Sequence, residues 1–286
     1  MGFRALGAMH KLGFPIWYGY GPEISKIVEE AHRIGFDYIE ISIDYPWPRG
    51  GEPSLSEVMK AIRGLGLSLG FHAPWRDLRL SSPFDEIRNA SIKIFEKIAL
   101  ELSAYDCDYL VAHLSTDQAV DRIDEIRGEV VEAATASAET LVEICRSLGL
   151  RLLVENVRED LEMFERIASR ADGVCLDLGH VIISTARRLE RDKIDAELEK
   201  WLSSLKDKVE AIHYSGVKFD GKHARDHQLT DSSDKYLRLL KRWLTELRPR
   251  HILLEVFEGA GEEHAWPRQL ADAVRFLKAS ESNPIA

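Results

Sequence analysis

Cysteine is scarce in this sequence of 286 residues, which contains only Cys107, Cys145 and Cys175. The three cysteines are odd in number, far apart and in no C-x-x-C pair, so they indicate neither a disulfide framework nor a thiolate zinc site. We therefore expect all three to be reduced thiols in the core of the protein.

Long apolar runs are also missing. The first residues, "MGFRALGAMHKLGF", contain no apolar stretch of signal length, and no window approaches the roughly 18 apolar residues of a membrane span. Positive charge is in deficit as well, because the formal net charge is −10. This balance argues against indiscriminate binding to nucleic acid, although it is compatible with a local basic groove. We expect a cytoplasmic protein without a membrane partner, and the sequence predicts no particular oligomeric state.

Short β-rich runs alternate with longer amphipathic stretches, several of which stop at glycine as helices often do. This alternation is typical of repeated βα units around a parallel sheet. Nothing in the sequence resembles a linker, so we expect one domain over residues 1–286. Eight units in about 250 residues predict a single (β/α)8 TIM barrel of the α/β class, with a doubly wound sheet as the weaker alternative. The eight predicted strands are 3–8, 37–42, 67–72, 108–113, 150–155, 173–177, 209–213 and 251–255.

The predicted strands end in polar residues, although a buried parallel strand should be apolar. The C-terminal ends of barrel strands surround the catalytic mouth, so these side chains should meet there. Any one of them is readily explained as a satisfied core histidine or a hydrogen-bonded carboxylate. The six strand ends in question carry His72, His113, Glu155, Asp177 with His180 just beyond, His213 and Glu255.

Ionisable groups from six strand ends in one ring would be costly to bury unless positive charge compensated them, and divalent cations supply that charge most simply. Imidazoles and carboxylates without thiolates suit zinc, manganese, cobalt or iron and exclude a soft copper(I) site. A purely structural polar network is the alternative. The pattern therefore predicts a divalent metal site at the mouth of the barrel.

At this point the sequence resembles the xylose isomerase-like barrel superfamily, which includes sugar isomerases, epimerases and endonuclease IV. The resemblance covers nearly the whole chain and lies in the order of its motifs. These are "HAPW…SSPFDEIRNASI" after the third predicted strand, "LLVENV", "VCLDLGH" and "IHYSG" at the fifth to seventh, "ARDHQL" beyond, and "ILLEVF" at the eighth.

The resemblance implies one of two metal patterns. Epimerase-like members hold one ion with Glu, Asp, His and Glu, which match Glu155, Asp177, His213 and Glu255. Endonuclease IV-like members hold three zinc ions and add four histidines, matched here by His72, His113, His180 and His227. They also use an Asp-x-His pair, but Asp226 is adjacent to His227 and Arg225 takes the expected aspartate position. One ligand of the three-metal set is therefore expected to be displaced or missing.

The loop after the second predicted strand favours sugar chemistry. The endonucleases carry a basic, Asn-Pro-Arg-like loop there, whereas the segment "YIEISIDYPWPRGG" of this chain, from the strand into the loop, has Glu40, Asp44 and Trp47 with only Arg49. The "HAPW…SSP" segment and the near-complete histidine set are instead more similar to the nuclease branch. We keep both interpretations, together with a non-catalytic metal-binding barrel.

In the favoured interpretation the chain is an isomerase or epimerase of a sugar, sugar phosphate or polyol, with one manganese, zinc, cobalt or magnesium ion. Glu155 and Glu255 would be catalytic, removing and returning a proton beside a metal-bound carbonyl. His72, Trp75, His180 and His227 would bind the substrate, and Trp47 or Tyr214 could also face the sugar ring. In the alternative, up to three zinc ions would hydrolyse abasic DNA, with Asp226 a further candidate ligand.

Overall fold

The computed structural model describes residues 10–120, 123–221, 223–259 and 264–279. Eight parallel strands form a closed barrel in the order β1-β10-β7-β6-β5-β4-β3-β2. The predicted (β/α)8 fold is confirmed, and closure rules out an open doubly wound sheet. The barrel strands are β1 (Lys11–Trp17), β2 (Tyr38–Ser42), β3 (Ser68–His72), β4 (Leu110–His113), β5 (Leu152–Glu155), β6 (Gly173–Asp177), β7 (Val209–Tyr214) and β10 (His251–Leu254).

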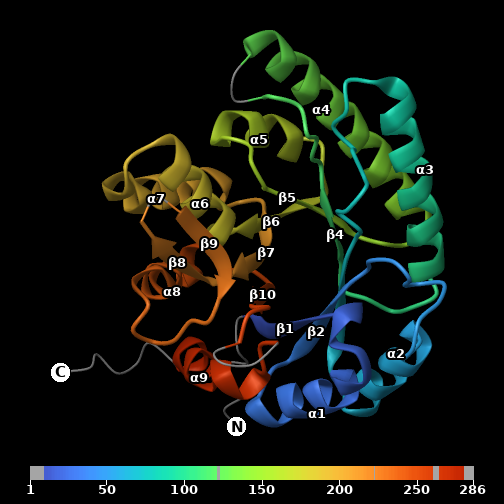
Figure 1. Cartoon of the computed structure of the whole chain (residues 1–286), viewed down its shortest axis with the longest axis vertical. Coiled ribbons are helices and arrows are strands. Elements are labelled where there is room, and N and C mark those ends of the chain that lie inside the picture. Colours follow the sequence, from blue (N-terminus) through green and yellow to red (C-terminus); the bar gives the residue numbers. More distant parts are fainter. Residues whose placement is uncertain (1–9, 121–122, 222, 260–263, 280–286) are drawn as a thin grey trace, which may run out of the picture.

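Helices surround the barrel, with α3 and α4 the longest of those described (Figure 1). Several begin at a side-chain cap, as the Ser54 and Glu57 capping box at α2 shows. None of the described helices is long and apolar enough to cross a membrane. The helices are α1 (Ile24–Ile34), α2 (Leu55–Gly64), α3 (Asp85–Leu102), α4 (Asp124–Ser147), α5 (Leu161–Ala168), α6 (Leu178–Arg188), α7 (Ile194–Leu205), α8 (Lys235–Leu247) and α9 (Ala271–Lys278), with short 3-10 turns at Tyr18–Glu23, Arg191–Lys193 and Pro267–Leu270.

The predicted first strand, 3–8, lies outside the described residues, and the barrel instead uses Lys11–Trp17 as β1. Pro15 lies inside β1, which makes this run look unlike a central strand because proline cannot donate to the ladder. The pairing with β10 covers only Lys11 to Gly13, so Pro15 lies beyond that ladder and is registered with β2 alone. The barrel thus accommodates a proline inside one of its strands.

The polar segment beyond β7 forms an antiparallel hairpin. Its strands are β8 (Gly216–Asp220) and β9 (His223–Gln228). The hairpin packs against α6, whose first turn carries His180. It thereby brings residues from beyond the barrel wall to the C-terminal end of β6.

Alternation along the strands separates two apolar layers. Residues such as Leu110 and Ala112 of β4 face the helices, whereas Val111 belongs to a smaller cluster inside the barrel. That inner cluster comprises Tyr38, Tyr109, Val111, Leu153, Cys175, Ala211 and Leu253. Because strand side chains repeat every two residues, the position two after each of these faces the same interior. His113, Glu155, Asp177, His213 and Glu255 each occupy such a position, one layer nearer the mouth.

Candidate metal centre

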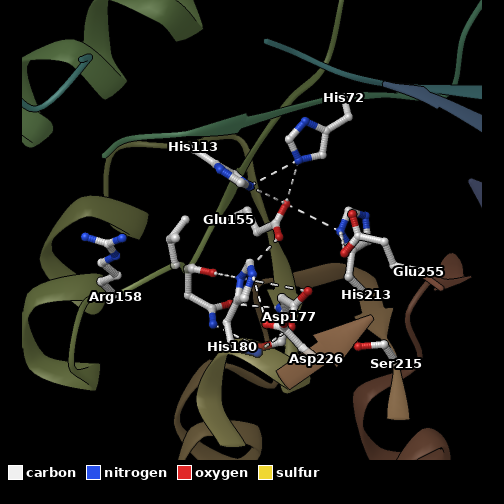
Figure 2. Close-up of polar contacts among 12 residues, drawn as sticks. His72, His113, Glu155, Arg158, Asp177, His180, His213, Ser215, Asp226 and Glu255 are labelled. Carbon is white, nitrogen blue, oxygen red and sulfur yellow. Dashed lines mark hydrogen bonds and ion pairs between the residues drawn. The ribbon is translucent and has the colours of Figure 1, made fainter. Parts of the chain in front are cut away.

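The polar strand ends meet at the C-terminal mouth of the barrel, as Figure 2 shows. Neighbouring strands place them in register, with His113 opposite Glu155 and Asp177 opposite His213. Within the described residues, three sets of these side chains have ligand atoms within 4.8 Å of one another and contain no cysteine. They are His72, His113 and Glu155; Glu155, Asp177, His213 and Glu255; and His180, Asp226 and His227.

The first set gathers around one oxygen of Glu155. His72 Nε2 lies 3.2 Å and His113 Nε2 lies 3.3 Å from Glu155 Oε2, and the two nitrogens are 3.1 Å apart. Glu155 and His72 are buried, at 2% and 3% exposed. Two imidazoles and a carboxylate with converging atoms form a three-ligand group of the kind that holds zinc.

The second set shares Glu155 with the first. His213 Nδ1 lies 3.4 Å from Glu155 Oε2 and 3.5 Å from Glu255 Oε2. Asp177 caps the N-terminus of α6 by accepting a hydrogen bond from the His180 N–H at 2.7 Å. Glu155 is therefore placed to bridge two ions, because it belongs to both sets.

The third set lies where α6 meets the hairpin. His180 Nε2 is 3.8 Å from Asp226 Oδ2, and His227 Nε2 is 3.9 Å from Asp226 Oδ1. Adjacent residues of a strand normally face opposite sides, but His227 adopts a left-handed conformation with φ of 53°. Asp226 therefore provides a carboxylate where one ligand of the three-metal set was expected to be displaced or missing. It is adjacent to His227, whereas one residue separates the two members of the Asp-x-His pair.

Three of the histidines have their Nδ1 atom close to a backbone carbonyl oxygen. His72 Nδ1 lies 2.8 Å from the Ala73 carbonyl oxygen, and His180 Nδ1 lies 2.9 Å from the Asn156 carbonyl oxygen. His227 Nδ1 is likewise 3.0 Å from the carbonyl oxygen of Glu255. An N–H donated to each acceptor leaves the other nitrogen with a free lone pair, which is the usual arrangement of metal-binding histidines.

Three buried atoms at the centre have no hydrogen-bond partner. They are Glu155 Oε1, His213 Nδ1 and Glu255 Oε2. Buried polar atoms are nearly always paired, so unpaired atoms that face one another need an explanation. A divalent cation bound between them would satisfy all three atoms, and the residues present therefore fit the predicted metal site.

Electrostatics shift the proton affinity of these groups in different directions. Burial lowers the pKa of His72, but the nearby Glu155 carboxylate raises it more, to about 9. Burial likewise opposes the charge on His180, whereas Asp177 and Glu155 bring its pKa to about 9. Burial raises the pKa of Asp177 to about 7, with the charge of Glu255 adding to the shift. Without cations the cluster therefore holds protons that ions would displace.

Cys175 also lies within ligand distance of Glu155 and His213. Burial raises the pKa of its thiol well above the usual range, so a thiolate is disfavoured in the metal-free protein. Among the described cysteines, all three are free; Cys145 and Cys175 are buried and Cys107 is partly buried.

A cavity of about 480 Å3 opens above the cluster. His72, His113, Glu155, His180, His227 and Glu255 line it, so the candidate ligands are reachable by a small molecule. Trp75 also lines the cavity and is 43% exposed, which places it where a substrate-binding residue is expected. Trp47 and Tyr214 are buried at 3% and 0% exposed, so the suggestion that they face the substrate is wrong.

Other residues of the cavity were not predicted from the sequence. Trp17, Phe257 and Glu159 line the cavity but do not end a predicted strand. Glu40 lies in the middle of β2 and points into the barrel, whereas the sequence indicated only an acidic residue in the segment that leads into the following loop. It receives a hydrogen bond from Tyr109 Oη at 2.6 Å. Its position two residues after the interior-facing Tyr38 is the signal that could have identified it.

Comparisons with known proteins agree with this architecture. The family described as "Xylose isomerase-like TIM barrel" matches residues 28–280. No curated protein matches the chain. Similar solved structures include the Escherichia coli 3-keto-D-glucoside 4-epimerase, at 15% identity, 94% and 99% coverage of this chain and that one, and a TM-score of 0.68.

Two other solved structures are similar over most of their length. One is the Clostridium cellulolyticum D-psicose 3-epimerase, with 17% identity, coverage of 95% and 93%, and a TM-score of 0.61. The other is Thermus thermophilus endonuclease IV, with 22% identity, coverage of 88% and 94%, and a TM-score of 0.58. At these identities the likeness concerns the fold, and the chemistry must be argued from the site itself.

Proposed function

We propose, from the premise that the chain belongs to the xylose isomerase-like TIM barrel family, that it is a metal-dependent hydrolase of small phosphate esters. The observation that carries the proposal is the convergence of His72 and His113 on Glu155, beside a second donor set that contains the same carboxylate. A site built for one ion gives these two histidines no ligand role. Adjacent sites that share a carboxylate are typical of hydrolytic phosphate chemistry.

Divalent ions in these sets would supply a nucleophile at neutral pH and stabilise the charge of the phosphoryl group in the transition state. The chain's own part is to fix the ligands: Glu155 spans two sets, and acceptors hold the Nδ1 atoms of His72, His180 and His227. Rigid ligands of this kind need little reorganisation during the reaction.

The cavity suits a small ester better than a DNA duplex. Its volume of about 480 Å3 lies in the range of small-molecule sites. Arg158 lines it and, together with ions bound at the cluster, would favour an anionic substrate, whereas Arg76 and Arg79 also line it but pair with Asp44 and Asp117. The net charge of −10 gives no general attraction to nucleic acid. A cavity that opens onto the ligands also favours an enzyme over a non-catalytic metal-binding barrel.

Isomerisation or epimerisation of a sugar or sugar phosphate is the second candidate. It is supported by Glu155 and Glu255, whose carboxylates both approach His213 Nδ1 and could exchange a proton with opposite sides of one substrate. One manganese, cobalt, zinc or magnesium ion in the set of Glu155, Asp177, His213 and Glu255 would be enough for this reaction.

The test is a parallel assay of the zinc-loaded protein. Chromogenic phosphate monoesters and diesters and an abasic-site duplex report hydrolysis, while sugars in D2O report proton exchange beside the carbonyl. We expect hydrolysis of the small esters, lost in Glu155→Gln and reduced at least 100-fold in His113→Ala. Deuterium incorporation that depends on Glu155 and Glu255, without hydrolysis of any ester, would overturn the proposal.

A further inference from the structure

Glu159 is a buried carboxylate in the wall of the cavity, between β5 and α5, and belongs to none of the three ligand sets. It is only 8% exposed. The backbone N–H groups of Val157 and Arg158 donate to its Oε2 at 2.7 and 3.0 Å. One oxygen is thereby fixed, and the carboxylate is held in place at the cavity wall.

No cationic side chain in the described residues pairs with Glu159. The other cavity carboxylates differ in this respect, because Asp44 pairs with Arg76 and Asp117 pairs with Arg79. A buried carboxylate without a paired counter-ion is costly unless some other group satisfies it. Burial raises the pKa of Glu159, against the effects of its backbone N–H donors and of the charge of His180.

The surroundings indicate which group would satisfy it. Arg158 lines the same cavity, and divalent ions bound at the cluster would add positive charge, so a cationic substrate would be repelled. A neutral hydrogen-bond donor is therefore favoured over an ammonium group. Val157 and Met163, which also line the cavity, offer an apolar surface for the carbon atoms that carry the donor.

We propose that Glu159 is a specificity-determining residue that accepts a hydrogen bond from a hydroxyl group on the alcohol part of the substrate. The substrate class is then a phosphate ester of a polyhydroxylated alcohol, rather than an alkyl phosphate. This inference rests on the proposed function, because it assumes that the phosphate group binds at the metal cluster.

Two ligands that differ only in hydroxyl groups test the inference. Glycerol phosphate and propyl phosphate have the same phosphate and carbon chain. Because the proposed enzyme would hydrolyse both, their affinities are compared as inhibition constants, Ki, in competition with a chromogenic phosphate ester on the zinc-loaded protein. A hydrogen bond to a charged group predicts about 10- to 100-fold tighter binding of glycerol phosphate. Glu159→Gln should remove this preference and change the Ki of propyl phosphate less than about 3-fold.

Propyl phosphate also reports whether the variant is folded, since its binding needs only the cluster. Glu162→Gln is the matched control, because Glu162 is an exposed carboxylate of the same segment, on α5. The role of Glu159 is overturned if Glu159→Gln still prefers glycerol phosphate, or if the variant loses the same affinity for both ligands. Either result leaves the proposed function standing. If the wild-type protein binds neither ligand, the proposed function fails and the inference fails with it.

Discussion

His213 Nε2 lies 3.1 Å from Glu40 Oε2, while the Nδ1 atom of the same ring faces Glu155 and Glu255. Both residues are buried, at 0% and 1% exposed. A carboxylate on one nitrogen keeps the proton there and leaves the other nitrogen as a ligand. Glu40 thus connects the inner layer of the barrel to the metal cluster and orients His213.

Replacement of this carboxylate should weaken metal binding. In Glu40→Gln the side-chain amide can donate to His213 Nε2, which would move the imidazole proton to Nδ1, the nitrogen that faces the cluster. We expect a 10- to 100-fold loss of zinc affinity at the set that contains His213, measured by competition with a chelator of known affinity. Tyr109→Phe removes hydrogen bonds to Glu40 and Tyr38 but keeps the Glu40 carboxylate, so it should have a smaller effect. Unchanged affinity in Glu40→Gln would refute the orienting role.

Replacement of the shared ligand should remove two ions, whereas replacement of an outer ligand should remove one. Glu155 belongs to both central sets, but His227 belongs to only one of the three cysteine-free sets. The metal content of Glu155→Gln after dialysis against zinc should therefore fall by about two ions per chain, and that of His227→Ala by about one. His223→Ala is the control, because His223 is exposed on β9. Equal losses in the two variants would argue against a bridging carboxylate.

The stability of the metal-free protein should decrease as the pH rises from about 6.5 to about 9. The pKa values of His72 and His180 lie at about 9 in the folded protein, against an ordinary value of 6.5. In that interval the folded state binds more protons than the unfolded state, so raising the pH reduces the free energy of unfolding. Thermal unfolding at pH 6.5, 7.5 and 9 measures the trend, which should be weaker in His72→Ala. A slope that is unaffected by this substitution would contradict the assigned pKa.

Zinc binding should also release protons. At pH 7.5 the imidazoles of His72 and His180 are largely protonated without ions, and they must lose a proton to become ligands. Calorimetric titrations in buffers of different ionisation enthalpy count the protons released per ion. We expect release to fall in His180→Ala, and no dependence on the buffer would contradict this interpretation.

The sequence was sufficient to predict the barrel and most of the strand ends. Val111, Leu153 and Cys175 face the barrel interior, and the metal-capable residue two positions beyond each follows from the period of a strand. Prediction failed where local patterns conflicted with the fold. The first strand was predicted at 3–8, but β1 is Lys11–Trp17, and its Pro15 is a residue seldom found in a central strand.

The third ligand set depends on backbone geometry that no periodic pattern reveals. The polar composition of His223–Gln228 is typical of a loop, although the segment forms strand β9. In a regular strand the adjacent residues Asp226 and His227 would face opposite sides. The left-handed conformation of His227 changes this arrangement. Glu159 was equally hidden, because its burial is set by the packing of a segment between strand and helix.

The central claim is that the mouth of the barrel is a cluster of three metal sites. It is tested most directly by the zinc content of the protein purified without chelator and measured by elemental analysis. With three ligand sets occupied, we expect close to three ions per chain. A content that saturates at one ion per chain, even after incubation with excess zinc, would contradict it and would favour the single-ion isomerase.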